Sequence, residues 1–335
     1  MININETKLL VTHTGVFHAD DVFSTAFIYL CKINTFCTSK EELSPMTTTV
    51  VKDTINKSLM NKTQNSLVIS RYNPDEVTDY TLPVVLRTTG IRDSESYPEE
   101  TLIYDIGGGK FDHHQVDAEL RPDGSRYAAF GLLFREFGHL LIPDEKSREN
   151  FDNWFVKGID DTDNGVGPNL LSSSISAYMP NWNEWNGPEA VNRAFLEAVL
   201  VAVEILSRVI LKANATASAT AILESSPVIE TDGGKILILE KYVPYNGWAF
   251  ENGFSAAVYP SNRGGYNCCV VSDPKNGNIC KFPVEWRGLT DKETFKEMTG
   301  IEGITFCHAS GFLLATETEL EAIKASGYLE PCVYE

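Results

Sequence analysis

The chain lacks the cysteine spacing of a disulfide framework or a zinc knuckle. It has seven cysteines, an odd number, and no two of them form a C-x-x-C pair. Such cysteines are typical of small core residues in a reducing compartment. The sequence also lacks an apolar run of membrane-spanning length, and its first residues lack the apolar stretch of a secretory signal. We therefore expect a cytoplasmic protein with no membrane partner.

Positive charge is scarce as well. Lys and Arg number 28 against 46 Asp and Glu, which gives a formal net charge of −18 at pH 7. This excess opposes broad electrostatic binding to nucleic acid, although a local basic groove or a bound cation can still hold a phosphate. The composition therefore argues against long duplexes as partners.

Length and patterning indicate two domains joined by a helix. At 335 residues the chain is too long for one small core. Apolar runs at 8–12, 83–87 and 101–105 predict buried parallel strands, and apolar residues recur at helical spacing from Pro188 to about Glu224. We predict an α/β fold with a parallel-sheet domain, a long connecting helix and a smaller α+β domain, at residues 1–187, 188–225 and 226–335 respectively.

The remaining elements are assigned by the same patterns. In the first domain, helices are expected from about Asp20 and over 127–137 and 151–160. The segment 34–80 mixes polar runs with one short apolar run, which admits an extra helix and an extra strand. In the last domain we predict strands at 235–239, 256–259 and 267–272, and helices at 291–299 and 317–326.

Histidine is rare, and its distribution is informative. Four of the six histidines form two short clusters, His13 with His18 and His113 with His114, and both clusters are rich in aspartate. Imidazole and carboxylate at close spacing suit divalent ions such as Mn²⁺. Two separated clusters suggest two metals in one pocket, an arrangement that serves in-line displacement at phosphorus.

The first cluster follows a predicted strand. His13 and His18 bracket a turn, and Asp20 follows. Side chains in this place project into the crevice where open α/β sheets bind ligands. The alternative is a helix N-cap carboxylate with two incidental surface histidines. Repetition of the same chemistry after another strand favours a ligand site.

The second cluster contains Asp105, which ends a predicted strand beside three glycines. A carboxylate there is placed to bridge two ions, or alternatively to start a turn. His113 and His114 are adjacent, so on an extended segment they point in different directions. We expect His113 to bind metal and His114 to face the substrate phosphate, while Asp112 orients an imidazole.

A third acidic cluster comprises Asp160, Asp161 and Asp163. Three carboxylates within four residues repel one another unless they are solvated or bound to a cation. A helix C-terminus, where we expect them, disfavours further negative charge. A cation site explains the cluster better than a surface face, although Asp163-Asn164-Gly165 is also typical of a plain turn.

Several stretches together resemble a known family. They are THTGVFHADD (12–21), YDIGG…FDHHQ (104–115), FVKGIDDTDNG (155–165), WNEW (182–185), WRGL (286–289) and CHASGF (307–312). They cover both halves of the chain in order. The set resembles the DHH phosphoesterase superfamily and, more closely, the melanocyte-proliferating-gene (MYG) family, which is described as metal-dependent hydrolases and 3′–5′ RNA exonucleases.

This resemblance implies two Mn²⁺ ions in the first domain, with Mg²⁺ or another divalent ion as an alternative, and a second domain that grips the substrate. Two positions depart from the closer family without removing a ligand: Ala19 stands where cysteine is usual and Asp21 where glutamate is usual. His18 stands where the superfamily more often has aspartate. The candidate metal ligands are His13, His18, Asp20, Asp105, His113 and Asp160, with Asp163 as the alternative to Asp160.

In the second domain, His308, Ser310 and Gly311 are candidates for a loop that contacts substrate. Arg263 and Arg287 are candidates for pairing with phosphate, which guanidinium binds through two hydrogen bonds. The alternatives are a buried, hydrogen-bonded His308 and an Arg287 whose stem packs against the neighbouring tryptophan.

The sequence thus predicts a Mn²⁺-dependent two-metal phosphoesterase, with a 3′–5′ exonuclease on RNA or short oligonucleotides as the leading hypothesis. His114, Asp112 and Arg287 are the predicted catalytic residues. Two alternatives stay open: a hydrolase of pyrophosphate, polyphosphate or a cyclic dinucleotide, and a metal-dependent nucleotide-binding protein without turnover. Exposed aromatic rings would favour RNA, since bases stack on them; Trp248, Tyr266 and Trp286 are the candidates. The oligomeric state stays open.

Overall fold

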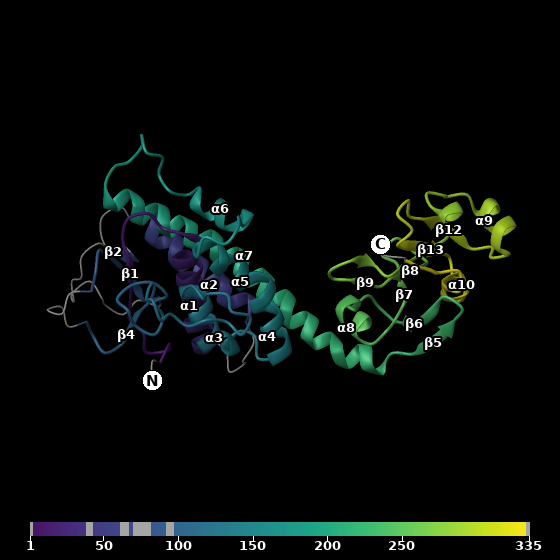
Figure 1. Cartoon of the computed structure of the whole chain (residues 1–335), viewed down its shortest axis with the longest axis horizontal. Helices are drawn as coiled ribbons and strands as arrows, with labels where there is room; N and C mark the ends of the chain where they lie inside the picture. The colour runs from purple at the N-terminus through teal and green to yellow at the C-terminus, as the bar shows by residue number, and fades with distance from the viewer. Residues whose placement is uncertain (1–2, 38–42, 61–66, 70–81, 92–96, 333–335) are drawn as a thin grey trace. The chain divides into compact units, whose positions relative to one another are not determined.

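The computed structural model describes residues 3–37, 43–60, 67–69, 82–91 and 97–332. The chain divides into two compact units, residues 1–214 and 215–335. The division falls within the long helix α7 (Pro188–Ser225), which is the long helix predicted from the sequence (Figure 1). Within the described residues, no helix has the length and apolar character needed to cross a membrane.

In the first unit, four of the described strands form a parallel sheet in the order β2-β3-β1-β4. The apolar runs predicted as parallel strands are therefore confirmed. Successive side chains alternate between the faces, so that Leu10 and Val85 join the main core while Leu9 and Val84 form a small cluster opposite. The strands are β1 (Leu9–His13), β2 (Val68–Ile69), β3 (Val84–Thr88) and β4 (Thr101–Ile103).

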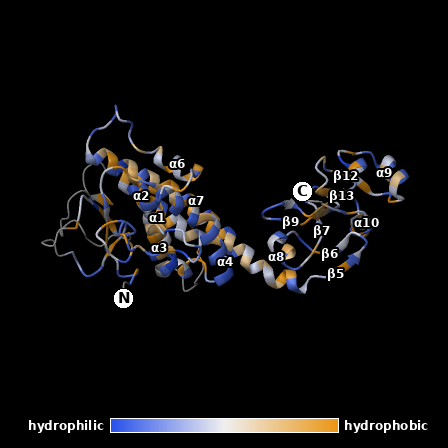
Figure 2. Ribbon diagram, in the orientation of Figure 1, coloured by the Kyte–Doolittle hydropathy of each residue, from blue (hydrophilic) through white to orange (hydrophobic). Residues whose placement is uncertain are grey.

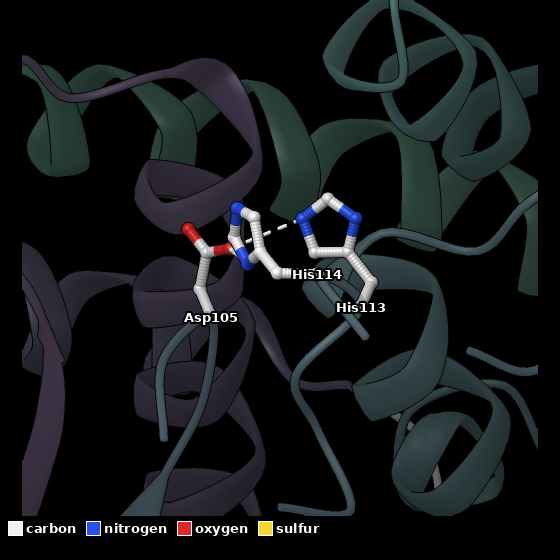
Figure 3. Close-up of side chains that lie close together, drawn as sticks. All are labelled: Asp105, His113 and His114. Atoms are coloured by element: carbon white, nitrogen blue, oxygen red, sulfur yellow. Dashed lines mark hydrogen bonds and ion pairs between the residues drawn. The ribbon is translucent and has the colours of Figure 1, made fainter. Parts of the chain in front are cut away.

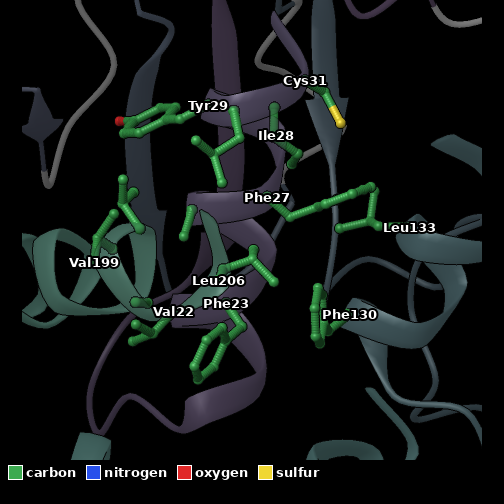
Figure 4. Close-up of a cluster of buried hydrophobic side chains, with 14 of the residues drawn as sticks. Val22, Phe23, Phe27, Ile28, Tyr29, Cys31, Phe130, Leu133, Val199 and Leu206 are labelled. Carbon is green, nitrogen blue, oxygen red and sulfur yellow. The ribbon is translucent and has the colours of Figure 1, made fainter. Parts of the chain in front are cut away.

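Helix α1 (Ala19–Cys37) occupies the centre of the main core. Its side chains from Ala19 to Cys31 are all buried, which explains why its apolar positions surround the helix instead of forming one stripe. Figure 4 shows α1 residues packed between side chains of α3 (Ala129–Phe137) and α7. Helix α4 (Glu145–Phe151), by contrast, is mostly hydrophilic (Figure 2) and buries Phe151.

The segment 34–80 contains the extra helix and strand that its pattern admits. These are α2 (Pro45–Met60), which buries Thr47, Val51 and Ile55, and the short strand β2. Residues 38–42, 61–66 and 70–80 of this segment lie outside the described residues.

The helix predicted over 151–160 differs from the structure. Helical backbone runs from α4 through a π-helical segment, Asp152–Val156, into α5 (Lys157–Asp163). The N–H of Lys157 bonds to the carbonyl of Asp152, five residues earlier, so the turn is one residue wider than an α-helical turn. Such a wide turn cannot be recognised from the 3.6-residue spacing of apolar residues in the sequence. The sequence also gave no signal for α6 (Leu170–Ser176), a single polar helix.

The second unit contains six described strands in one mixed sheet, ordered β12-β13-β8-β7-β6-β5. Its two faces bury separate clusters: Ile236 faces the same cluster as Phe295, and Leu237 faces the cluster that contains Leu223 of α7. The smaller α+β architecture is as predicted. The strands are β5 (Val228–Thr231), β6 (Gly234–Ile238), β7 (Ala256–Pro260), β8 (Tyr266–Val270), β12 (Ile304–Cys307) and β13 (Leu313–Thr316).

Helices and short strands complete this unit. Helix α10 contacts strands β7, β8 and β13 of the sheet. The elements are α8 (Asn246–Glu251), α9 (Lys292–Thr299), α10 (Glu319–Ser326), β9 (Ser272–Asp273), β10 (Gly277–Asn278), β11 (Cys280–Lys281) and β14 (Glu330–Pro331).

Candidate metal centre

Parallel strand register joins the two histidine clusters. Strands β1 and β4 are neighbours, with Val11 opposite Ile103. Two residues further along each chain, His13 and Asp105 therefore leave the same edge of the sheet. The distance from His13 Nε2 to Asp105 Oδ2 is 3.2 Å.

A tight loop follows Asp105. This aspartate has a left-handed backbone (φ 57°), and its N–H donates to the carbonyl of Phe111 at 2.9 Å, which folds the chain back on itself. Gly107 has φ 89°, and a Cβ there would lie 2.7 Å from Ile91 Cγ1. Only glycine fits this position without displacement, because both the backbone angle and the space exclude a side chain.

This loop brings His113 back beside Asp105. His113 Nε2 lies 3.2 Å from Asp105 Oδ1, and the exposed His114 places its Nδ1 3.8 Å from the same oxygen (Figure 3). The sequence predicts that the adjacent rings point in different directions. They lie 4.3 Å apart and converge, because these residues are not in an extended strand.

Asp112 orients an imidazole, and that imidazole is His114. His114 Nδ1 lies 2.7 Å from Asp112 Oδ1, while Asp112 Oδ2 accepts the N–H of Gly108 at 2.7 Å. Burial raises the pKa of Asp112, but the hydrogen bonds from Gly108 and His114 outweigh burial and lower the pKa below its ordinary value. Asp112 is therefore ionised at neutral pH and accepts the hydrogen bond of His114 Nδ1.

The third acidic cluster separates into three environments. Asp163, the last residue of α5, lies 3.2 Å from His113 Nε2 and 3.4 Å from His18 Nδ1. Asp161 pairs with Lys157. The sequence left Asp160 and Asp163 as alternative ligands, and the structure brings Asp163 to the histidines.

Asp160 lies in a different network. Its Oδ2 accepts Arg121 Nη2 at 2.5 Å, and its Oδ1 accepts the N–H of Gly131 at 3.1 Å. Arg121 also pairs with Asp152. Burial raises the pKa of Asp160 to about 7, although Arg121 opposes this shift. Both carboxylate oxygens of Asp160 are thus hydrogen-bonded. Among the described residues, Asp160 belongs to none of the groups of His and Asp side chains that could hold a metal ion.

Asp20 has two roles in the structure. Its oxygens accept the N–H groups of Ala129 (3.1 Å) and Phe130 (2.8 Å), so it caps the N-terminus of α3 from another helix. It also lies in a group with His113 and Asp163 whose ligand-type atoms are all within 4.8 Å of one another. Because an ionised carboxylate has about four acceptor positions, the cap leaves capacity for an ion.

Two further groups share Asp105 with each other, and one of them shares His113 with this group. Asp105 forms one with His113 and His114, and another with His13 and Asp21, a residue that we did not select from the sequence. Two ligand atoms bound to one ion at about 2.1 Å and roughly 100° lie about 3.2 Å apart. The spacing of the imidazoles around Asp105 matches this separation, so the donor set fits divalent ions.

The electrostatics of the cluster also fit cations. Burial lowers the pKa of His13, but its contacts with Asp105 and Asp21 outweigh burial and raise the pKa to about 11. Asp105 and Asp163 similarly overcome burial and raise the pKa of His113 to about 11. These raised pKa values indicate a strongly negative electrostatic potential at the site. The C-terminal end of α5 contributes to it, because the helix dipole is negative there. A divalent ion experiences the same attraction and competes with these protons.

The cluster opens into a cavity of about 690 Å³, within the range of about 300–1,000 Å³ for small-ligand sites. None of the described residues that line the cavity is Lys or Arg. The lining comprises His13, Val16, His18, Asp105, Ile106, Gly107, Asp112, His113, His114, Asp163 and Asn164.

The residues predicted for substrate binding lie in the second unit, where His308, Ser310 and Gly311 share one loop that Arg287 contacts. His308 Nδ1 accepts the N–H of Ser310 at 3.0 Å, and its ring packs 4.4 Å from that of Phe312. Arg287 Nε donates to the carbonyl of Phe282 at 2.9 Å. The alternative of a hydrogen-bonded His308 among apolar rings thus finds support, with a half-buried ring. Packing of the Arg287 stem against Trp286 stays a prediction.

Gly311 completes this loop. It has φ 71°, and a Cβ there would lie 2.7 Å from Arg287 Nε. Arg263 is exposed in the turn between β7 and β8. Because Tyr266 pairs with Thr316 and Cys269 with Leu313, this turn and the His308 loop lie at opposite ends of β8.

Of the aromatic candidates for base stacking, Trp286 belongs to the core of the second unit, while Trp248 and Tyr266 are half-buried. Trp286 is 2% exposed and stacks on Phe282. Trp248 and Tyr266 pack against separate hydrophobic clusters.

The fold and site define an α/β protein with a histidine–aspartate centre at the carboxyl edge of a parallel sheet. Residues 74–326, which are more than half of the chain, match the model of the family MYG1_exonuc, described as "Uncharacterised protein family (UPF0160)". The chain belongs to this family. The matched region includes Asp105, His113 and Asp163, whereas His13 and His18 precede it.

Three relatives show the extent of the similarity. The MYG1 exonuclease of Bos taurus is 28% identical over 289 residues, covering 70% of this chain and 74% of that protein. The MYG1 exonuclease of Homo sapiens is 26% identical over 271 residues, covering 66% and 72%. The MYG1 protein of Schizosaccharomyces pombe is 26% identical over 273 residues, covering 68% and 83%.

Proposed function

We propose that this chain is a metal-dependent exonuclease that hydrolyses phosphodiesters with two Mn²⁺ ions, from 3′ to 5′, on RNA or short oligonucleotides. One observation carries the proposal: Asp105 presents one oxygen to His13 and the other to His113, each at 3.2 Å. This is how a carboxylate shared by two ions is placed. The names of the bovine and human relatives support nuclease chemistry.

The ligands would divide between two ions. His13 and Asp105 would hold one, and Asp20, His113 and Asp163 the other, with Asp105 shared. His18 lines the cavity, with its Nδ1 3.4 Å from Asp163 Oδ1. Bound there, the ions would supply a hydroxide nucleophile at neutral pH and offset the charge of the phosphoryl oxygens.

His114 is the residue best placed to contact the phosphate. Its Nδ1 is held by Asp112, and its side chain is 62% exposed in the cavity. With Nδ1 donating to Asp112, Nε2 can donate to a phosphoryl oxygen when the ring carries a proton on both nitrogens. A donor oriented before the reaction stabilises developing charge without reorganisation, which is the role that we propose for His114.

The cavity lining explains why the ions matter for substrate binding. Since no described lining residue is Lys or Arg, an anionic phosphodiester meets a negative site unless cations are bound. Short single strands fit the chain's charge better than duplexes do. Arg287, Arg263, His308, Ser310 and Gly311 remain proposed substrate contacts in the second unit.

A direct test compares substrates and metals with one protein preparation. We expect release of mononucleotides from the 3′ end of a 5′-labelled RNA 10-mer with Mn²⁺ and none with EDTA. His113→Asn should abolish this release. Asp161→Asn, which removes a carboxylate that pairs with Lys157 outside the described metal-type groups, should not.

Two results would overturn the proposal. The first is equal nucleotide release in EDTA and in Mn²⁺. The second is faster hydrolysis of pyrophosphate than of any oligonucleotide, which would instead establish the small-phosphate alternative.

A further inference from the structure

Asp21 stands in the first turn of α1, where a carboxylate commonly stabilises a helix. Its Oδ1 accepts the N–H of His18, the residue before the helix, at 2.9 Å. This bond is one half of a capping box, and the negative charge also complements the helix dipole. Helix stabilisation thus accounts for Oδ1.

It does not account for the other oxygen. Asp21 is fully buried, and its Oδ2 accepts no hydrogen bond. His13 Nε2 lies 3.3 Å away, but the same nitrogen lies 3.2 Å from Asp105 Oδ2. A buried carboxylate oxygen without a hydrogen bond is costly and requires an explanation.

The buried Arg87 does not supply that hydrogen bond. Burial lowers the pKa of Arg87, and attraction to Asp21 opposes the shift, so the two charges interact through space. The Nη atoms of Arg87, however, donate to Gly15 O at 3.1 Å and Asn192 Oδ1 at 3.3 Å. The guanidinium offsets the charge of Asp21 and leaves Oδ2 facing His13.

We propose that Asp21 is a further metal ligand, with Oδ2 as the donor atom to the ion held by His13 and Asp105. The ligand-type atoms of these three residues lie within 4.8 Å of one another. The inference rests on the proposed function, in that the site must bind divalent ions. It adds a second carboxylate to this ion, which favours a hard ion such as Mn²⁺ over Zn²⁺.

Asp21→Asn separates the two roles of the side chain. The amide oxygen can still accept the N–H of His18, and the volume is almost unchanged, but the anionic donor is lost. Titration calorimetry should show two Mn²⁺ sites in the wild type, one of them weakened at least about tenfold in the variant. Asp161→Asn, the matched control, should keep both sites.

Thermal melting provides a readout that does not depend on activity. Melting in EDTA gives the metal-free baseline of each protein, which in Asp21→Asn lacks the attraction of Asp21 to His13 and Arg87 but keeps the cap. With Mn²⁺, the wild type should gain more in melting temperature than the variant does. A crystal of the wild type grown with Mn²⁺ should place an ion within about 2.3 Å of Asp21 Oδ2.

The outcomes distinguish this inference from the proposed function. A wild type that binds no Mn²⁺ defeats both. A wild type with two sites whose Asp21→Asn variant binds equally well defeats the Asp21 assignment alone. If the variant fails to fold, the crystal decides: an ion more than 3 Å from Oδ2 rejects the assignment, and a bound one supports it.

Discussion

The two units both gather polar side chains at a glycine-containing loop, but they differ in what those side chains already bind. In the first unit, Asp105 is shared by two imidazoles and Asp21 Oδ2 has no hydrogen bond. In the second, His308 Nδ1 and Arg287 Nε are satisfied by the backbone of their own surroundings. The first arrangement has the donor atoms of a group that could hold an ion, whereas in the second these two nitrogens are hydrogen-bonded within the loop and its neighbourhood.

The most severe test of this contrast is Asp105→Asn. Because Asp105 is shared by both proposed ions, we expect loss of Mn²⁺ binding and a fall in kcat/KM on the order of 10³-fold, since a metal contributes several kcal/mol to the transition state. Steady-state kinetics and calorimetry measure the two effects. Unchanged hydrolysis by this variant would remove the basis for the metal centre.

A second test sharpens the contrast inside the acidic cluster. Asp160→Asn should lower the free energy of unfolding by about 1–3 kcal/mol, because it weakens a buried pair with Arg121, and should leave Mn²⁺ binding intact. Asp163→Asn should weaken Mn²⁺ binding and leave the free energy of unfolding nearly unchanged. Urea unfolding and calorimetry on both variants check this; the opposite pattern would make Asp160 the ligand.

A third test uses pH. As the pH rises, the apparent affinity for Mn²⁺ should increase and the stability of the ion-free protein should decrease. The pKa values of His13 and His113 are raised to about 11 without ions, so Mn²⁺ must displace protons. Its apparent affinity should rise with pH, by up to about tenfold per unit for each proton released. Calorimetry in two buffers of different ionisation enthalpy counts those protons.

Without ions, these shifts also contribute to folding. A pKa raised from 6.5 to about 11 stabilises the folded protein fully below pH 6.5, and this contribution is lost as the pH rises towards 11. Urea unfolding in EDTA at several pH values should therefore show stability falling over this interval. An affinity for Mn²⁺ that falls as the pH rises would contradict the expected competition between Mn²⁺ and the imidazole protons.

The smallest effect is expected in the second unit. Gly311→Ala should destabilise the protein by about 1 kcal/mol, because a side chain would occupy a left-handed position beside Arg287. Mn²⁺ binding should be unaffected, since the loop contributes no ligand in the described metal groups. Melting curves and calorimetry measure both. Loss of Mn²⁺ affinity would show that the two loops are not independent.

Much of the candidate site could be anticipated because its side chains follow strand ends. His13 and Asp105 come after apolar runs that are parallel strands, and strand ends meet at one edge of the sheet. The π-helical segment before α5 could not be anticipated, because it adds one residue to a single turn and leaves no periodic signal. The convergence of His113 and His114 likewise depends on a loop whose path is set by backbone bonds.

The sequence by itself determined the α/β class, the long helix and the chemistry of the cluster, because hydrophobic period and side-chain type are local properties. Only the tertiary structure brought Asp163, not Asp160, to the histidines, gave Asp20 its place at the start of α3, and left one oxygen of Asp21 without a hydrogen bond. These outcomes depend on which donors the fold brings within about 3 Å of each carboxylate, and those donors come from distant segments.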